Sequence, residues 1–126
     1  MKKKILLVDD EETLVTLVRV TLEDENYDII EANDGDNAVR LARDERPDLV
    51  LLDVRIPGKN GFEVCRIIKT EIDIAIPVIL LTAGTQKKDR EAGAAAGADD
   101  FVTKPFSPLT LLERVKSILK EQVNGR

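Results

Sequence analysis

The sequence predicts a single α/β domain in which one parallel sheet is covered by helices on both faces. Short apolar runs with the character of strands alternate five times with stretches of helical spacing. The run Leu49–Asp53 is apolar at every position but its last, which is typical of a parallel strand buried under helices. Right-handed crossovers between such units wind helices onto both faces of a sheet. We therefore expect a doubly wound (βα)5 domain over residues 1–126, with the flavodoxin-like strand order 2-1-3-4-5.

The expected strands are short and are separated by polar or proline-containing connections. They cover residues 4–8, 28–31, 49–53, 78–82 and 100–103. Four of the helices that follow them carry apolar stripes at helical spacing: the first at Leu14, Leu17, Val18 and Leu22, the second at Ala38, Leu41 and Ala42, the third at Phe62, Cys65, Ile68 and Ile72, and the fifth at Leu111, Leu112, Val115, Ile118 and Leu119.

The fourth helix differs from the others in its composition. It is expected over residues 86–96, is rich in alanine and contains Gly93, with Gly97 as the residue after its C-terminus. Small side chains bury little surface, so we expect this helix to pack shallowly and to shift most readily. Elsewhere, Asn60 is placed to cap the third helix, and Ser107 with Pro108 to begin the fifth.

Composition limits the classes of function. Hydrophobic residues make up 43% of the chain and charged residues 34%, which excludes both a disordered tail and a membrane-spanning protein. A net charge of -5 without a block of Lys and Arg argues against direct nucleic-acid binding. The single Cys65 cannot form an internal disulfide and lies on an apolar helical stripe, which predicts a buried structural thiol and a cytoplasmic location.

Three carboxylates are predicted to meet at one edge of this sheet. Asp9 and Asp10 follow the first strand and Asp53 ends the third, and the expected strand order makes these strands neighbours. Carboxylates about 5 Å apart repel by roughly 3 kcal/mol per pair at an effective dielectric of about 20, so a cation must compensate them. An all-oxygen ligand set in a chain without histidine favours Mg²⁺ over zinc. We therefore predict a Mg²⁺ site that also receives an anionic reactant.

A hydroxyl and an ammonium are predicted at the same edge. Thr82 ends the fourth strand and Lys104 follows the fifth. Taken singly, a strand-end threonine reflects strand propensity and a loop lysine is solvated. Acid, hydroxyl and ammonium at the ends of neighbouring strands are, however, what phosphoryl transfer to a carboxylate requires.

Four motifs resemble the receiver domain of two-component response regulators, the family that includes the chemotaxis response regulator. The resemblance covers almost the whole chain and rests on Val8-Asp9-Asp10-Glu11, on Asp53 with Pro57 and Gly61, on Leu81-Thr82-Ala83, and on residues 97–101 running into Lys104-Pro105-Phe106. It implies that Asp53 accepts a phosphoryl group from the phosphohistidine of a sensor histidine kinase or phosphotransfer protein. The phosphorylated domain would then act on a downstream effector.

The resemblance also implies roles for individual residues. Asp9, Asp10, Asp53 and the carbonyl of Arg55 would hold Mg²⁺, while Thr82 and Lys104 would contact phosphoryl oxygens. Phe101 would be the aromatic switch that turns inward when Thr82 moves, and the Lys104–Pro105 bond would be cis.

The sequence departs from the family pattern at several positions. Lys59 replaces an apolar residue, and Phe101 replaces a frequent tyrosine. Many DNA-binding regulators dimerise through a charged set that includes Asp99, Asp100 and Arg114 here, but Ala95 and Thr110 stand where acids are expected. We therefore expect a monomer or a weak phosphorylation-dependent dimer.

Three alternatives remain open at this point. A flavin- or nucleotide-binding protein can share the fold, although no glycine-rich phosphate loop follows the first strand. A Mg²⁺-dependent phosphohydrolase could act through an aspartyl-phosphate, but Arg55 stands where its general acid is expected. A degenerate receiver would bind partners without phosphorylation, which the complete acidic set disfavours.

Overall fold

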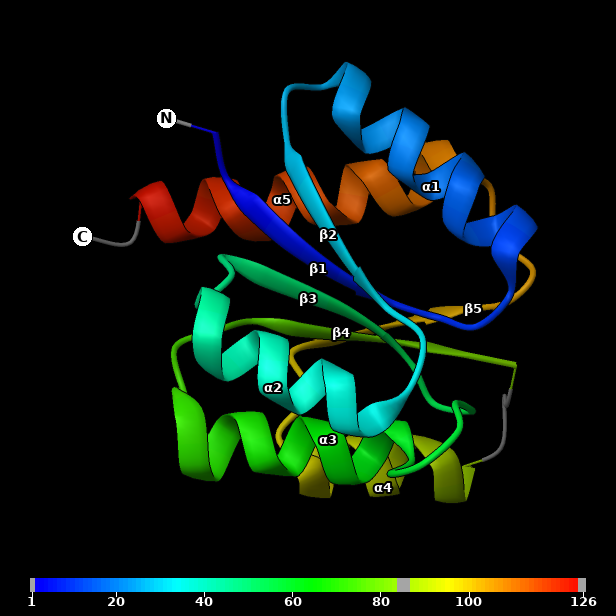
Figure 1. Cartoon of the computed structure of the whole chain (residues 1–126), viewed down its shortest axis with the longest axis vertical. Coiled ribbons are helices and arrows are strands. Elements are labelled where there is room, and N and C mark those ends of the chain that lie inside the picture. Colours follow the sequence, from blue (N-terminus) through cyan, green and yellow to red (C-terminus); the bar gives the residue numbers. More distant parts are fainter. Residues whose placement is uncertain (1, 84–86, 125–126) are drawn as a thin grey trace.

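A computed structural model describes residues 2–83 and 87–124, with the side chains of residues 2–83 and 87–120. It forms one five-stranded parallel sheet in the order β2-β1-β3-β4-β5 (Figure 1), which confirms the predicted order. The strands are β1 (Lys4–Val8), β2 (Asp28–Ala32), β3 (Leu49–Asp53), β4 (Val78–Thr82) and β5 (Asp100–Thr103). The helices are α1 (Glu12–Asp24), α2 (Gly35–Glu45), α3 (Gly61–Ile67), α4 (Lys87–Ala96) and α5 (Pro108–Asn124).

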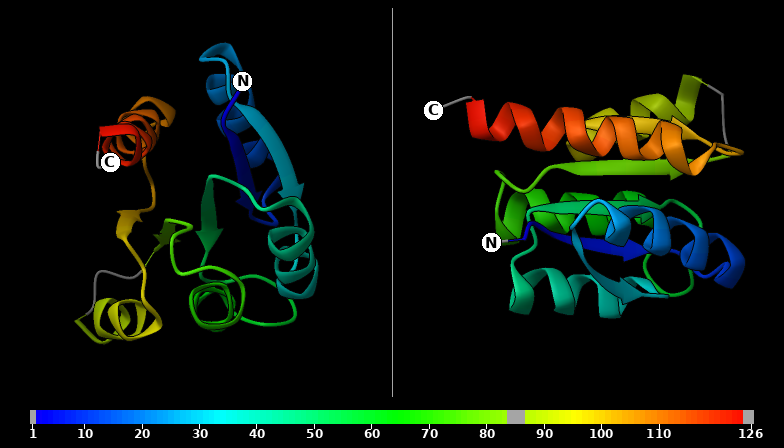
Figure 2. Two further views of the ribbon diagram at one scale, coloured as in Figure 1. Left: turned by 90° about the vertical axis from the view of Figure 1, so that its left-hand side faces the viewer. Right: turned by 90° about the horizontal axis from the view of Figure 1, so that it is seen from above.

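The sheet separates two helical layers. Helices α1 and α5 cover one face and α2, α3 and α4 cover the other (Figures 1 and 2). Because successive strand side chains point to opposite faces, Leu51 belongs to the core under α1 and α5, whereas Leu52 belongs to the other core. All five strands run in parallel, so the loops that follow them gather at one edge.

Two element boundaries differ from the sequence-based expectation. Strand β2 continues one residue further, because Ala32 is buried and pairs in register with Val8. The third helix is not α-helical throughout: after α3 it continues as a π-helix, η1 (Ile68–Ile72), in which Asp73 N donates to the carbonyl of Ile68 at 2.8 Å. The expected start of the fourth helix at Gln86 lies outside the described residues.

The predicted caps and the buried thiol are confirmed. Asn60 Oδ1 accepts from Glu63 N at 2.9 Å, and Ser107 Oγ accepts from Thr110 N at 3.1 Å. Gly97 follows α4 with a φ of +91°, a conformation that favours glycine. Cys65 is fully buried, and burial raises the pKa of its thiol to about 11, so it remains a neutral core side chain.

A buried lysine lies at the edge where the strands begin. The Lys69 side chain is 8% exposed, and its ammonium contacts Asp99 Oδ2 at 2.7 Å. It also donates to the carbonyls of Ile74 at 3.0 Å and Ile76 at 2.7 Å. The same Asp99 oxygen accepts from Val78 N at 2.8 Å, so this lysine cluster joins η1 to the start of β4. Among the described residues, no helix is both long enough and apolar enough to span a bilayer.

Candidate phosphoacceptor and metal site

Asp53 ends the central strand β3 and is nearly buried. Its side chain makes two hydrogen bonds, with Oδ1 accepting from Arg55 N at 3.1 Å and Oδ2 accepting from Lys104 Nζ at 3.0 Å. The first bond links the Asp53 side chain to the loop that follows its own strand. The second joins it to the segment after β5.

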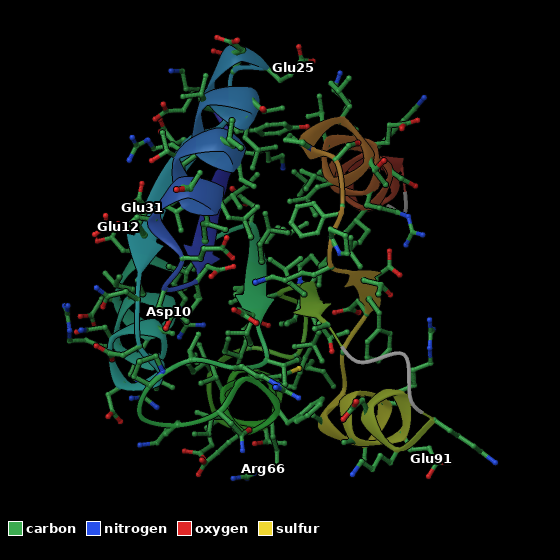
Figure 3. The ribbon with its side chains drawn as sticks, turned by 90° about the vertical axis from the view of Figure 1, so that its right-hand side faces the viewer. Asp10, Glu12, Glu25, Glu31, Arg66 and Glu91 are labelled. Carbon is green, nitrogen blue, oxygen red and sulfur yellow. The ribbon has the colours of Figure 1, made fainter. Side chains whose placement is uncertain are left out.

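Asp9 and Asp10 follow β1, the strand that pairs directly with β3. The Asp9 side chain is buried, and its Oδ1 accepts from Glu11 N at 3.0 Å. Asp10, the next residue, is exposed at the rim of this edge (Figure 3). Carboxylate oxygens of Asp9, Asp10 and Asp53 lie within 4.8 Å of one another, which confirms their predicted convergence.

Lys104 lies between the two buried carboxylates. Its ammonium is 3.0 Å from Asp9 Oδ2 and 3.0 Å from Asp53 Oδ2. Burial alone would lower the pKa of Lys104, but the hydrogen bonds to Asp9 and Asp53 outweigh it and raise that pKa, so the ammonium stays charged. The Lys104–Pro105 bond is cis, as expected.

The charges of this site do not cancel. Desolvation raises the pKa of Asp53 above its ordinary value, with a further contribution from the Asp9 charge, while the Arg55 amide and Lys104 oppose the shift. One ammonium faces three carboxylates, which leaves an excess of negative charge. The site is therefore suited to a second cation.

The donor set fits Mg²⁺. Its three carboxylates supply only oxygen ligands, which this hard cation prefers. Two of these side chains are buried and fixed by hydrogen bonds, while Asp10 is exposed and leaves one side open to water. An incomplete protein cage with room for water is characteristic of Mg²⁺ rather than of Ca²⁺.

A groove adjoins the acidic site. It has a volume of about 710 Å³, and its lining includes Asp9 and Asp10, residues of the first half of α1, and the start of α2. Glu12 and Glu31, which also line it, lie on the same side of the edge as Asp10 (Figure 3). The groove thus borders the acidic site on the side of Asp9 and Asp10.

Thr82 lies beside this constellation at the end of β4. Its side chain is buried, and its carbonyl accepts from Lys104 N at 2.8 Å. The strand before it pairs with β3, placing Leu81 opposite Asp53. The sequence predicted Thr82 at this edge. The structure shows in addition that the Thr82 backbone is hydrogen-bonded to the segment that contains Lys104.

Phe101, the expected aromatic switch, packs against α4. A Cβ atom added to Gly93 would lie 2.5 Å from the Cζ atom of Phe101 and 2.9 Å from Leu80 Cδ1. The Arg90 guanidinium stands 5.9 Å from the ring centroid. The ring is therefore half-buried against the backbone of α4, with the Arg90 guanidinium of the same helix over its face.

Two contributions to the site were missed from the sequence. One is the simultaneous contact of the Lys104 ammonium, which was itself predicted at this edge, with both Asp9 and Asp53. The other is the contact between the loop after Asp53 and the first turn of α2 at Gly35. The unusual Lys59 in that loop was the available signal, because its ammonium pairs with Asp36.

A phosphoacceptor module is the class of protein that this edge defines, and comparison with known proteins gives the family. The response regulator receiver domain model matches residues 5–116, so the chain belongs to that family. It is a signalling module with an acidic Mg²⁺ site at Asp9, Asp10 and Asp53, rather than an enzyme with a turned-over substrate. Membership decides against the flavin-binding and phosphohydrolase alternatives.

The alkaline phosphatase synthesis transcriptional regulatory protein PhoP of Bacillus subtilis is 47% identical over 120 residues, which cover 95% of this chain and 50% of PhoP. The chain thus spans about half the length of this relative. A CheY-like receiver domain protein from Methanospirillum hungatei superimposes with a TM-score of 0.92 at 28% identity, covering 100% of both chains. The receiver domain of the sensor histidine kinase PA1611 from Pseudomonas aeruginosa gives a TM-score of 0.86 at 32% identity, covering 95% of this chain and 99% of that one. Its structure has a magnesium ion coordinated in the active site cleft.

Proposed function

We propose that Asp53 is the residue that takes the phosphoryl group from a histidine kinase or phosphotransfer protein. A carboxylate oxygen of Asp53 attacks phosphorus, the P–N bond to the donor imidazole breaks, and the imidazole keeps the electron pair. The observation that carries this proposal is the Lys104 ammonium, held 3.0 Å from both Asp53 and Asp9 where new phosphoryl oxygens would need positive charge.

Each remaining residue has a proposed part in that transfer. Asp9, Asp10, Asp53 and the Arg55 carbonyl would hold Mg²⁺, which supplies positive charge to the carboxylates and to the phosphoryl oxygens when bound. Thr82 and Lys104 would donate to two phosphoryl oxygens. The magnesium ion in the active site cleft of the PA1611 receiver supports Mg²⁺ as the cation.

We further propose that phosphorylation is read out at the face formed by α4, β5 and α5. A group with a charge of about -2 at Asp53 favours the conformer that brings Thr82 and Lys104 to it. Phe101 would follow Thr82 inward, and α4 would move with the ring. A downstream effector would bind this face, with the receiver acting as a monomer or a weak phosphorylation-dependent dimer.

The wider setting is proposed from the same family membership. Residues 1–126 would form one receiver domain in the cytoplasm. PhoP is named as a transcriptional regulator, but a net charge of -5 favours no direct nucleic-acid contact by this domain. Any such contact would then be made by another protein or domain.

Acetyl phosphate in the presence of Mg²⁺ tests the acceptor. The parent should gain one phosphoryl group, seen by intact-mass spectrometry, and Asp53→Asn should gain none. Asp99→Asn is the matched control, because Asp99 also lies at a sheet edge beside a lysine, and it should be modified like the parent. Equal modification of Asp53→Asn and the parent would place the acceptor elsewhere.

A further inference from the structure

We infer that the first turn of α2 positions the loop that follows Asp53, and that Gly35 is the positioning residue at this contact. The loop covers residues 54–60 and includes Arg55, whose amide donates to Asp53 Oδ1 at 3.1 Å. The inference rests on the proposed function, because Arg55 is also the proposed carbonyl ligand. It assigns a role in the metal site to α2, an element that supplies none of the proposed ligands.

The helix and the loop approach each other backbone to backbone. Gly35 N, the first amide of α2, donates to the carbonyl of Pro57 at 2.9 Å. A Cβ atom at Gly35 would collide with the carbonyl oxygen of Lys59, and would lie 2.8 Å from both N and Cβ of Lys59. Backbone atoms cannot swing aside as a side chain can, so a Cβ here must displace the loop, the helix, or both.

The next residues extend this contact. Gly58 has a φ of +78°, and a Cβ on it would lie 3.3 Å from Asp36 Oδ2. Lys59 Nζ donates to Asp36 Oδ1 at 2.7 Å. Three consecutive loop residues, Pro57, Gly58 and Lys59, therefore contact Gly35 and Asp36 of the first turn of α2.

Other contacts fix the two ends of the loop. Val54 N donates to the carbonyl of Leu81 at 3.1 Å, and Gly61 N donates to the carbonyl of Val54 at 2.9 Å. Ile56 is buried in the core below the loop. The contact with α2 thus fixes the outer half of the loop, beginning two residues after the Arg55 amide.

Unlike ordinary packing, this contact controls the position of a residue that is hydrogen-bonded to Asp53. A displaced Pro57 pulls on Ile56 and Arg55, and the amide bond to Asp53 Oδ1 weakens steeply when its geometry is lost. Residues that orient metal ligands typically change metal affinity about 10- to 100-fold when they are replaced. Gly35 should therefore affect Mg²⁺ affinity by more than its effect on stability alone would predict.

The chain offers a matched pair of glycines for the test. Gly58 and Gly97 both have positive φ values, +78° and +91°, and an added Cβ would make its closest contact at 3.3 Å and 3.1 Å respectively. Gly97, however, lies beside Lys69, at the opposite edge of the sheet from Asp53. Alanine at either position should impose similar backbone strain, but only Gly58→Ala strains the loop after Asp53.

Two measurements are made on the parent, Gly35→Ala, Gly58→Ala and Gly97→Ala. The first is hydrogen exchange of the Arg55 amide by NMR in metal-free protein, taken relative to the global unfolding of each variant. The second is Mg²⁺ affinity by calorimetry. We expect faster Arg55 exchange and an affinity at least about tenfold weaker in Gly35→Ala, a smaller loss in Gly58→Ala, and neither change in Gly97→Ala.

The outcomes separate the inference from the proposed function. If Gly35→Ala does not fold, the Gly58→Ala and Gly97→Ala pair decides, and equal affinities in that pair overturn the inference. Unchanged exchange at Arg55 in both loop-contact variants also overturns it. Failure of the parent to bind Mg²⁺ would overturn the proposed metal site, and the exchange measurement would still judge whether α2 positions the loop.

Discussion

Two partly buried lysines lie at opposite edges of one sheet, and their surroundings differ in charge. The Lys69 ammonium contacts one carboxylate and two carbonyls. Its positive charge is therefore balanced by a single negative charge, and its three N–H donors all have acceptors. Lys104 is shared by Asp9 and Asp53, with Asp10 close by. The balanced cluster joins secondary structure elements, whereas the unbalanced cluster leaves negative charge for a cation to offset.

The largest expected effect comes from removing each ammonium. Lys69→Met leaves Asp99 without its cation and two carbonyls without a donor, and should cost about 2 kcal/mol of unfolding free energy. This loss should be the same with and without Mg²⁺. Lys104→Met should also destabilise the protein, but Mg²⁺ should recover part of the loss because it compensates the same carboxylates.

Urea denaturation of both variants, with and without Mg²⁺, checks this difference. The unfolding midpoint should change while its slope with denaturant stays constant. If Mg²⁺ restored the stability of Lys69→Met, or restored none of the stability lost in Lys104→Met, the two clusters would not differ as described.

A smaller effect, of opposite sign at the two edges, is expected from neutralising one acid. In metal-free protein, Asp53→Asn removes a charge that is disfavoured by burial and by the Asp9 charge, and it also loses the charge-assisted hydrogen bond to Lys104. Because the raised pKa of Asp53 means that the unfavourable contributions outweigh the hydrogen bonds, we expect a net gain in unfolding free energy on the order of 1 kcal/mol. Asp99→Asn instead removes the only carboxylate near Lys69 among the described contacts, and should lose about 1 kcal/mol because Asp99 is partly solvated.

Thermal or urea unfolding in the presence of a chelator measures both changes under one condition. Addition of Mg²⁺ should then reverse the order of the parent and Asp53→Asn, since the variant lacks a proposed ligand. Destabilisation by Asp53→Asn in chelator would show that the carboxylates of this site are already compensated.

The smallest effect is on the pH dependence of stability. The folded protein raises the pKa of Asp53 through desolvation and the Asp9 charge, so the native state holds this proton more tightly than the unfolded chain. Stability contributed by protonated Asp53 is complete below its ordinary pKa, about 4, and is lost as pH rises through the folded value. Metal-free parent should therefore become less stable relative to Asp53→Asn as pH rises from about 4 to 7. Equilibrium unfolding of the two proteins across this range tests the sign, and the opposite trend would contradict the burial argument.

Much of this edge could be predicted because parallel strands deliver their last residues to one place. Asp9, Asp53, Thr82 and Lys104 needed only strand boundaries and strand order to be brought together. The exposure of Asp10 beside the buried Asp9 was not predicted, because both residues lie beyond the end of β1, where the alternation of strand side chains no longer applies.

Other features depended on backbone geometry that a residue pattern does not encode. The partners of Lys69 are mainly carbonyls of the connection before β4, and carbonyls have no sequence signature. The π-helix η1 is so short that its apolar residues keep the spacing of an α-helix. The pattern of Ile68 and Ile72 therefore could not distinguish the two helix types. The contact of Gly35 with Lys59 depends on a missing Cβ and on a loop 24 residues away.

The close approach of Gly93 to Phe101 makes the position of α4 above the sheet depend in part on the Phe101 ring. Because Gly93 brings the helix backbone against the Phe101 ring, no β-carbon of this residue separates the two. Rotation of that ring would open a void, and voids of this kind are costly in a close-packed interior. A shift of α4 toward the sheet would close that void, so rotation of the Phe101 side chain and displacement of the helix would be coupled.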